Sequence, residues 1–202
     1  MPRKAVDQEL SRERILEVAR HLFVTKGYRS ISMRSIGQQL GYSHGSLYYH
    51  FKDKAELFYA LVQEDFFHLA RLFERVMAQV PTEGMTKLEQ IMLEFTRFGL
   101  TNPHHYEIMF MTRDEELLAY ARAEQARLLE MFSVIVRQTM AINLQGENEG
   151  HNIPRSLFLA MHGFISFYIQ DQVSFEDVKP AAAAHVRFLC RRAMEAVQSA
   201  SA

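Results

Sequence analysis

The sequence has a single cysteine, no tryptophan, only five prolines and no long apolar run. The lone Cys190 cannot form an intramolecular disulfide, so a fold held together by disulfides is excluded. A helix needs about 18 or more consecutive apolar residues to span a bilayer, and no such run occurs. The first residues, Met1 to Leu10, lack the apolar core of a signal peptide. We therefore expect a cytoplasmic protein with no membrane partner.

The charge is nearly balanced overall but uneven along the chain. With 202 residues, 48% of them hydrophobic, the chain is long enough for a sizeable core, which excludes disorder. A net charge of −1 is unpromising for a nucleic-acid binder if it is spread evenly. The first 60 residues, however, carry 10 Lys and Arg against 6 Asp and Glu, whereas the rest carry 13 against 18. A basic N-terminal part on an acidic body is a first indication of partners.

Apolar residues recur with the helical period throughout, and no segment alternates like a strand bounded by hairpin turns, which predicts an all-α fold. Three short helices are expected first: one from near Ser11 to Gly27, one capped by Ser32 and ended by Gly41, and one over His44 to Phe51. Polar breaks, the last of them Asp171 to Lys179, then separate long amphipathic helices. These are expected near 53–80, 85–100, 103–111, 115–141, 153–170 and 180–199, which makes about nine helices.

Two short helices separated by Gly41-Tyr42-Ser43 have the spacing of a helix-turn-helix, in which the second helix lies in the major groove. On that second helix Leu47 and Phe51 share the inward face, so Gly45, Ser46, Tyr48 and Tyr49 point mostly outward. Burial of both tyrosines in the same subunit is one interpretation, but so short a helix has little circumference left for it.

The stretch from Ser32 to Leu57 reads SMRSIGQQLGYSHGSLYYHFKDKAEL. It resembles the DNA-binding signature of TetR-type transcriptional regulators, and the most specific part is Gly45-x-Leu47-Tyr48-x-His50-Phe51-x-x-Lys54. The resemblance covers about the first 60 residues, including Arg14-Ile15-Leu16, Ala19, Leu22-Phe23 and Gly27-Tyr28. Two positions depart from the pattern: Gly37 stands where the family usually has alanine, and Tyr42 replaces a small aliphatic residue.

The resemblance implies a set of DNA-facing residues, and their chemistry agrees with that role. Lys54 and the hydroxyl groups of Ser43 and Tyr48 suit phosphate oxygens, whereas other side chains suit base edges or thymine methyl groups. Arg34 suits either, and His50 suits packing at the helix end equally well. Arg3 and Lys4 add nonspecific attraction or belong to a solvated tail. The predicted DNA-binding residues are Arg34, Ser43, His44, Gly45, Ser46, Tyr48, Tyr49, His50 and Lys54.

The resemblance further implies a DNA-binding domain over 1–55 and a helical effector-binding and dimerisation domain over 56–202. Within the latter, the segment from Asn102 to Phe110 and the later Ala160-Met161-His162-Gly163 are similar to a class of C-terminal domain named for a Trp-His-Gly triplet. Met161 stands where the tryptophan would be.

The composition indicates an adaptable apolar cavity, because 15 Phe and 11 Met side chains fill irregular space. Such a cavity favours an apolar or amphipathic ligand, for example an acyl chain or an aromatic compound. Plain core packing is the alternative for each residue taken singly. The predicted lining is Phe95, Phe98, Met109, Phe110, Phe132, Phe158 and Met161, with Arg97 or His162 as polar anchors.

The helix expected from Ile153 to Gln170 is apolar nearly all round, so it is buried on two sides. One side can pack in its own subunit and the other against a second copy, together with the last helix. The alternative is the innermost core helix of a monomer. The predicted dimer-interface residues are Phe164, Tyr168, Val186, Leu189, Ala193 and Val197.

Together with these patterns, the resemblance implies a ligand-responsive transcriptional regulator, usually a repressor, that binds a palindromic operator as a homodimer. An enzyme is the main alternative, argued by nine histidines, but His104 and His105 diverge by about 100° on a helix and no HExxH or CxxC spacing occurs. We therefore expect no catalytic residue, metal or cofactor. The other alternative is a helical ligand-binding or adaptor protein that does not bind DNA. This interpretation leaves the basic N-terminal part and the outward tyrosines unexplained.

Overall fold

The computed structural model describes residues 10–79, 85–112, 114–141 and 152–200. Within these ranges the chain forms nine α-helices, one 3₁₀ turn and one π-helical turn, and no strand, which confirms the all-α class. The elements are α1 (Arg12–Lys26), η1 (Tyr28–Ser30), α2 (Met33–Leu40), α3 (His44–Leu47), α4 (Lys54–Ala78), α5 (Lys87–Thr101), α6 (Pro103–Tyr106), η2 (Glu107–Met111), α7 (Glu115–Met140), α8 (Asn152–Gln170) and α9 (Phe175–Ala200).

The first two helices begin and end at the residues that the sequence predicts. The Ser11 hydroxyl accepts a hydrogen bond from the backbone N–H of Arg14, which caps α1. Ser32 and Ser35 form a capping box at the start of α2. Gly27 and Gly41, both at φ +78°, end the two helices in a backbone conformation that L side chains rarely adopt.

The third helix is shorter than predicted, because α3 covers His44–Leu47 and not His44 to Phe51. The Tyr48 N–H donates to the Gly45 carbonyl (3.3 Å), and the His50 N–H donates to the Leu47 carbonyl (3.0 Å). These bonds span three residues and tighten the chain into turns. Tyr48 and Tyr49 therefore lie in a turn that follows the helix.

Two later boundaries also differ from the prediction. Helix α9 begins at Phe175 and not near 180, because Ser174 caps it by exchanging hydrogen bonds with Asp177, and Pro180 is accommodated inside the helix. The second half of the predicted polar break, Asp171 to Lys179, therefore belongs to α9. The helix expected over 103–111 is divided into α6 and the π-helical turn η2.

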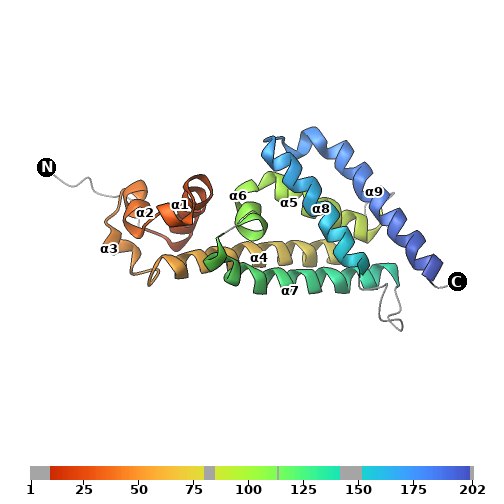
Figure 1. Cartoon of the computed structure of the whole chain (residues 1–202), viewed down its shortest axis with the longest axis horizontal. Coiled ribbons are helices and arrows are strands. Elements are labelled where there is room, and N and C mark those ends of the chain that lie inside the picture. Colours follow the sequence, from red (N-terminus) through yellow and green to blue (C-terminus); the bar gives the residue numbers. More distant parts are fainter. Residues whose placement is uncertain (1–9, 80–84, 113, 142–151, 201–202) are drawn as a thin grey trace.

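The N-terminal helices α1–α3 form a group at one end of the molecule, and α4 runs from this group along the body (Figure 1). Helix α7 packs beside α4, α5 packs on α4, and α8 and α9 pack on α5. The predicted division between 1–55 and 56–202 falls in the first turn of α4 and stays a prediction. No helix in the described part of the chain has the length and apolar character needed to cross a membrane.

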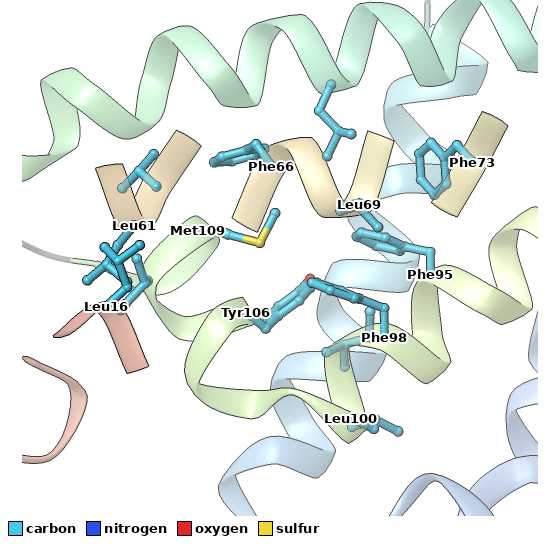
Figure 2. Packing of buried hydrophobic residues seen from close by; sticks show 14 of the residues in the cluster. Leu16, Leu61, Phe66, Leu69, Phe73, Phe95, Phe98, Leu100, Tyr106 and Met109 are labelled. Carbon is cyan, nitrogen blue, oxygen red and sulfur yellow. The ribbon is translucent and has the colours of Figure 1, made fainter. Parts of the chain in front are cut away.

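One cluster of buried side chains extends from α1 to α9. Figure 2 shows Leu16 of α1 beside Leu61 of α4, and farther along α4 the side chains of Phe66 and Phe73 face the body. Since the buried cluster continues across the start of α4, the N-terminal helices are packed on the body rather than joined to it only by a linker.

Candidate DNA-binding surface and aromatic cluster

The turn between α2 and α3, together with α3 and the turn after it, presents exposed polar and aromatic side chains at one end of the molecule. Tyr49 is 92% exposed and Tyr48 is 50% exposed, whereas the neighbouring Leu47 and Phe51 are buried. The predicted inward and outward faces are therefore observed. We call the surface formed by Ser43, His44, Ser46, Tyr48 and Tyr49 the recognition surface.

Local contacts order part of the recognition surface. The hydroxyl groups of Ser43 and Ser46 lie 3.0 Å apart and share a hydrogen bond. The His44 ring meets the Tyr48 ring edge-on, with centroids 6.2 Å apart. Arg34 is exposed on α2. The surface thus offers hydroxyl, imidazole and phenol groups of the kinds that contact DNA phosphates and base edges.

Gly37 explains how α2 and α3 come so close together. A Cβ atom at this position would lie 3.1 Å from the Tyr42 carbonyl oxygen and 3.2 Å from both the backbone N and the Cα of His44. These are backbone atoms, which yield less readily than the end of a side chain. The departure from alanine noted in the sequence therefore coincides with close packing of α2 on the start of α3.

Lys54 has a structural role that the sequence did not predict. Its Nζ donates hydrogen bonds to the backbone carbonyls of Tyr28 and Ile31, each at 2.8 Å, and lies 3.9 Å from the centre of the Tyr28 ring. The ammonium group therefore ties the start of α4 to the turn η1. His50, four residues before Lys54, is partly buried at the end of the turn after α3.

Aromatic side chains from four helices and one turn meet inside the body. The Phe95 ring lies 5.9 Å from Tyr106, 6.1 Å from Phe110 and 5.7 Å from Phe158, between ring centroids. The rings of Phe158 and His162 are stacked at 6.4 Å. We call Phe95, Tyr106, Phe110, Phe158 and His162 the aromatic cluster. Phe132 of α7 packs at its edge, 6.5 Å from Phe158.

A neutral hydrogen bond joins two members of the aromatic cluster. The Tyr106 hydroxyl lies 2.7 Å from Nδ1 of His162. Burial raises the pKa of Tyr106 well above its ordinary value and lowers the pKa of His162 below its ordinary value. Near neutral pH, both side chains are therefore uncharged, and the hydrogen bond joins a neutral phenol to a neutral imidazole. Nε2 of His162 then points to the Ser166 hydroxyl at 3.5 Å.

The predicted pocket residues do not all belong to the aromatic cluster. Phe98 packs instead against His105, with ring centroids 6.4 Å apart. The Arg97 guanidinium lies over the Phe175 ring at 5.0 Å, at the start of α9. Met109 and Met161 are fully buried. Sequence reasoning missed Tyr106, although it lies in the segment from Asn102 to Phe110 that carried the resemblance.

The predicted interface residues divide into two groups. Val186 and Ala193 of α9 are buried inside the subunit, so they do not lie on its surface. The others are partly buried: Phe164, Tyr168, Leu189 and Val197. Sequence reasoning missed four large apolar side chains that the two helices expose: Leu159 and Phe167 of α8, and Phe188 and Met194 of α9.

A charged network joins the N-terminal helices to the body. Both carboxylate oxygens of the buried Asp65 in α4 face Arg20 of α1, at 2.7 Å and 3.3 Å. Nδ1 of His105 in α6 lies 2.8 Å from the same carboxylate, and the more exposed Glu64 lies 3.2 Å from Arg20. Three elements thus meet at Asp65. Among the described residues, no group of three His, Cys, Asp or Glu side chains is arranged to hold a metal ion.

Comparison with known proteins agrees with this architecture. Residues 15–61 match the model of the N-terminal domain described as bacterial regulatory proteins, tetR family. Residues 88–190, about half of the chain, match the model described as the tetracyclin repressor-like C-terminal domain. The chain therefore belongs to the TetR family.

Individual relatives resemble this chain in its N-terminal part or in its fold. An HTH-type transcriptional regulator of Staphylococcus aureus (strain USA300) is 46% identical over 59 residues, which are 29% of this chain and 32% of that protein. The chain thus aligns with about a third of the length of this curated relative.

Solved structures match over nearly the whole chain. The fatty acid degradation regulator FadR of Bacillus halodurans has a TM-score of 0.70 at 15% identity, over 93% of this chain and 97% of that one. The MbdR regulator of Azoarcus sp. CIB has a TM-score of 0.69 at 20% identity, over 86% and 95%. At these identities the similarity shows the shared fold.

Proposed function

We propose that this protein is a transcriptional regulator that binds double-stranded DNA at a palindromic operator as a homodimer, and that it is a repressor released by a small effector. The recognition surface carries the proposal, since an almost fully exposed Tyr49 beside Tyr48 follows a helix-turn-helix in a TetR-family chain. Aromatic rings left in water at such a site favour a partner that covers them. The basic N-terminal part of the sequence suits an anionic partner.

The test is binding of the purified protein to the intergenic DNA beside its own gene, titrated against salt and compared with a random duplex. We expect the natural DNA to bind at least about a thousandfold more tightly than the random duplex at physiological salt. Equal affinity for both at several salt concentrations, with no site recovered in a genome-wide selection, would contradict the proposal.

Substitutions in the recognition surface give the residue-level test. We expect Tyr48→Ala and Tyr49→Ala each to weaken operator binding by about 1–3 kcal/mol while the helical content and stability stay unchanged. Phe67→Ala is the matched control, because Phe67 is an exposed aromatic residue of α4 outside the recognition surface. An operator affinity that survives both tyrosine substitutions would remove these residues from the interface.

A homodimer is supported by the outer faces of α8 and α9. Leu159, Phe167 and Phe188 leave large apolar side chains in water, and a Cβ at Gly163 of α8 would meet nothing within 4 Å. A second copy that packs α8 and α9 into a four-helix arrangement would cover them and place two recognition surfaces on one operator. We expect Phe167→Glu to give a folded monomer by analytical ultracentrifugation with weakened operator binding. Phe67→Glu is the control and should stay dimeric.

The aromatic cluster is the site we propose for the effector. Its rings and the neutral Tyr106–His162 pair suit an apolar or amphipathic molecule with one hydrogen-bonding group. The similar regulator of Bacillus halodurans acts in fatty acid degradation by its description, which is consistent with this ligand class. A ligand releases DNA only to the extent that it prefers the DNA-incompetent state. The test is a screen of fatty acids and aromatic acids for loss of operator binding, in which Phe158→Trp should keep DNA affinity and lose the response.

A further inference from the structure

A cavity is lined by residues from the start of α5, the end of α7 and the second half of α9. These segments lie together at the end of the body away from α1–α3 (Figure 1). The cavity volume is about 690 Å³, within the range of about 300–1,000 Å³ that ligand pockets have. Its apolar wall consists of Leu88, Met140, Cys190 and Met194. None of these residues belongs to the aromatic cluster, so this is a different site.

The apolar wall is flexible and uncharged. Methionine thioethers adapt their shape to an occupant. Burial, and the nearby Glu89 carboxylate, raise the pKa of the Cys190 thiol to about 12, so this group is protonated and behaves as a small apolar side chain. Among the residues that the structure describes, no aromatic side chain lines the cavity. The wall therefore offers no ring on which a nucleobase or other planar ligand would stack, and it suits an aliphatic chain.

The rim of the cavity is cationic. Arg187 and Arg191 lie one helical turn apart on α9, both are exposed, and neither has an ion-pair partner within the described ranges. The next residue, Arg192, differs, because its guanidinium lies 2.7 Å from the Glu195 carboxylate. Two guanidinium groups without carboxylate partners thus stand at the mouth of an apolar pocket.

The charged residues on the opposite wall are already engaged. Nζ of Lys87 donates to the Val76 carbonyl at 3.1 Å, and the Glu89 carboxylate accepts from the Thr86 backbone N–H at 2.6 Å in the capping box of α5. These two opposite charges largely offset one another. Arg187 and Arg191 therefore make the net charge at the cavity positive, which favours an anionic group.

We propose that this cavity binds a single-chain amphiphile with an anionic head group, the head on Arg187 and Arg191 and the aliphatic chain against Met140, Cys190 and Met194. Guanidinium groups form two parallel hydrogen bonds with carboxylate or phosphate oxygens, which suits either head group. The site is separate from the proposed effector site, and the proposal does not depend on DNA binding.

The absence of tryptophan from the chain makes a direct test available. Met194→Trp places a single indole at the solvent-exposed end of the apolar wall, where the native side chain is 38% exposed. We expect sodium dodecanoate, titrated below its critical micelle concentration, to shift the indole emission with saturation at one molecule per chain. Dodecyl phosphate should do the same, and the uncharged methyl dodecanoate should bind at least tenfold more weakly.

Variants then locate the head group and the site. In the Met194→Trp background, changing both Arg187 and Arg191 to Gln should weaken dodecanoate binding at least tenfold and leave the methyl ester unchanged. Arg192→Gln is the matched control on the same helix and should have no effect. Bound dodecanoate should also slow the reaction of Cys190, the only cysteine, with a small thiol reagent in the unmodified protein.

Three outcomes would overturn the proposal. The first is an emission change that does not saturate. The second is equal affinity for the acid and its ester that the arginine variants do not alter. The third is dodecanoate binding, measured by calorimetry, that is lost in Phe158→Trp and kept in the arginine variants, since this would place the amphiphile in the aromatic cluster. None of these outcomes bears on operator binding, so failure here is distinguishable from failure of the proposed function.

Discussion

The recognition surface and the aromatic cluster are built in opposite ways. The recognition surface comes from a few consecutive residues, and its tyrosines are exposed because Leu47 and Phe51 on either side are buried. The aromatic cluster collects residues from distant parts of the chain, and each ring is held by several others. Substitution in the first region should therefore change binding with little change in stability, whereas substitution in the second should change stability as well.

The adjacent residues His105 and Tyr106 connect the two ends of the molecule. His105 contacts Asp65 beside the N-terminal helices, and Tyr106 contacts His162 in the aromatic cluster. Both lie in the four-residue helix α6, so a change in one contact moves an element that also carries the other. Because α6 carries both contacts, it is a candidate for coupling the N-terminal helices to the aromatic cluster. Substitutions at Asp65 and at His162 change one contact each.

The largest effect is expected where the two regions are joined. Asp65→Ala leaves the Arg20 guanidinium buried without its closest anion, which should lower the free energy of unfolding by about 3–5 kcal/mol. Denaturant titration of the purified variant measures this. Glu64→Ala is the matched control, since Glu64 pairs with the same guanidinium but is 41% exposed, and it should cost about 1 kcal/mol or less. Equal losses in the two variants would show that burial of the Arg20–Asp65 pair is not what stabilises this junction.

Alanine substitutions at two glycines, Gly99 in the body and Gly45 in α3, compare the two regions directly. A Cβ at Gly99 of α5 would lie 2.6 Å from Cγ2 of Ile165 and 3.0 Å from Cδ2 of Tyr106, and both neighbours are fully buried. Gly99→Ala should therefore cost about 1–3 kcal/mol through overpacking against the aromatic cluster. At Gly45 a Cβ would meet only the Ser43 hydroxyl, at 3.7 Å.

Gly45→Ala should accordingly leave the free energy of unfolding unchanged, or raise it slightly through better helix propensity. Operator binding should fall, because the added methyl group lies where we expect DNA to approach. Denaturant titration and operator binding, each applied to Gly45→Ala and Gly99→Ala, measure the difference between the two regions. A stability loss at Gly45 as large as that at Gly99 would contradict the proposed difference between the regions.

The same contrast explains what the sequence could predict. The recognition surface is local, so helix period and capping residues were sufficient to place Tyr48 and Tyr49 outward, although they did not predict that α3 ends at Leu47. The aromatic residues of the body were identified by type, but type alone could not separate Phe158, which joins the cluster, from Phe98, which does not. Arg20 and Asp65 are 45 residues apart, and no periodicity indicates that they pair.

Lys54 tests whether a residue near the recognition surface acts on DNA or on the fold. Lys54→Ala removes two hydrogen bonds to the Tyr28 and Ile31 carbonyls and should lower the free energy of unfolding by about 1–2 kcal/mol. Lys52→Ala, at an exposed neighbour, should change it by about 0.5 kcal/mol or less. If Lys54→Ala instead left stability intact and reduced the salt dependence of DNA binding by about one ion, its main contact would be a phosphate group.

The smallest effect is expected from pH, and it belongs to the aromatic cluster alone. Burial lowers the pKa of His162 below its ordinary value of 6.5, so the unfolded chain binds a proton at this position more readily than the folded protein does. The stabilisation from neutral His162 is therefore complete above about pH 6.5 and is lost as the pH falls through the lowered value. We expect the free energy of unfolding to decrease between pH 7 and pH 5 more steeply in the native protein than in His162→Gln. The difference between the two slopes removes the contributions of the other histidines, and parallel slopes would mean that His162 is not held in its neutral form by the surrounding rings.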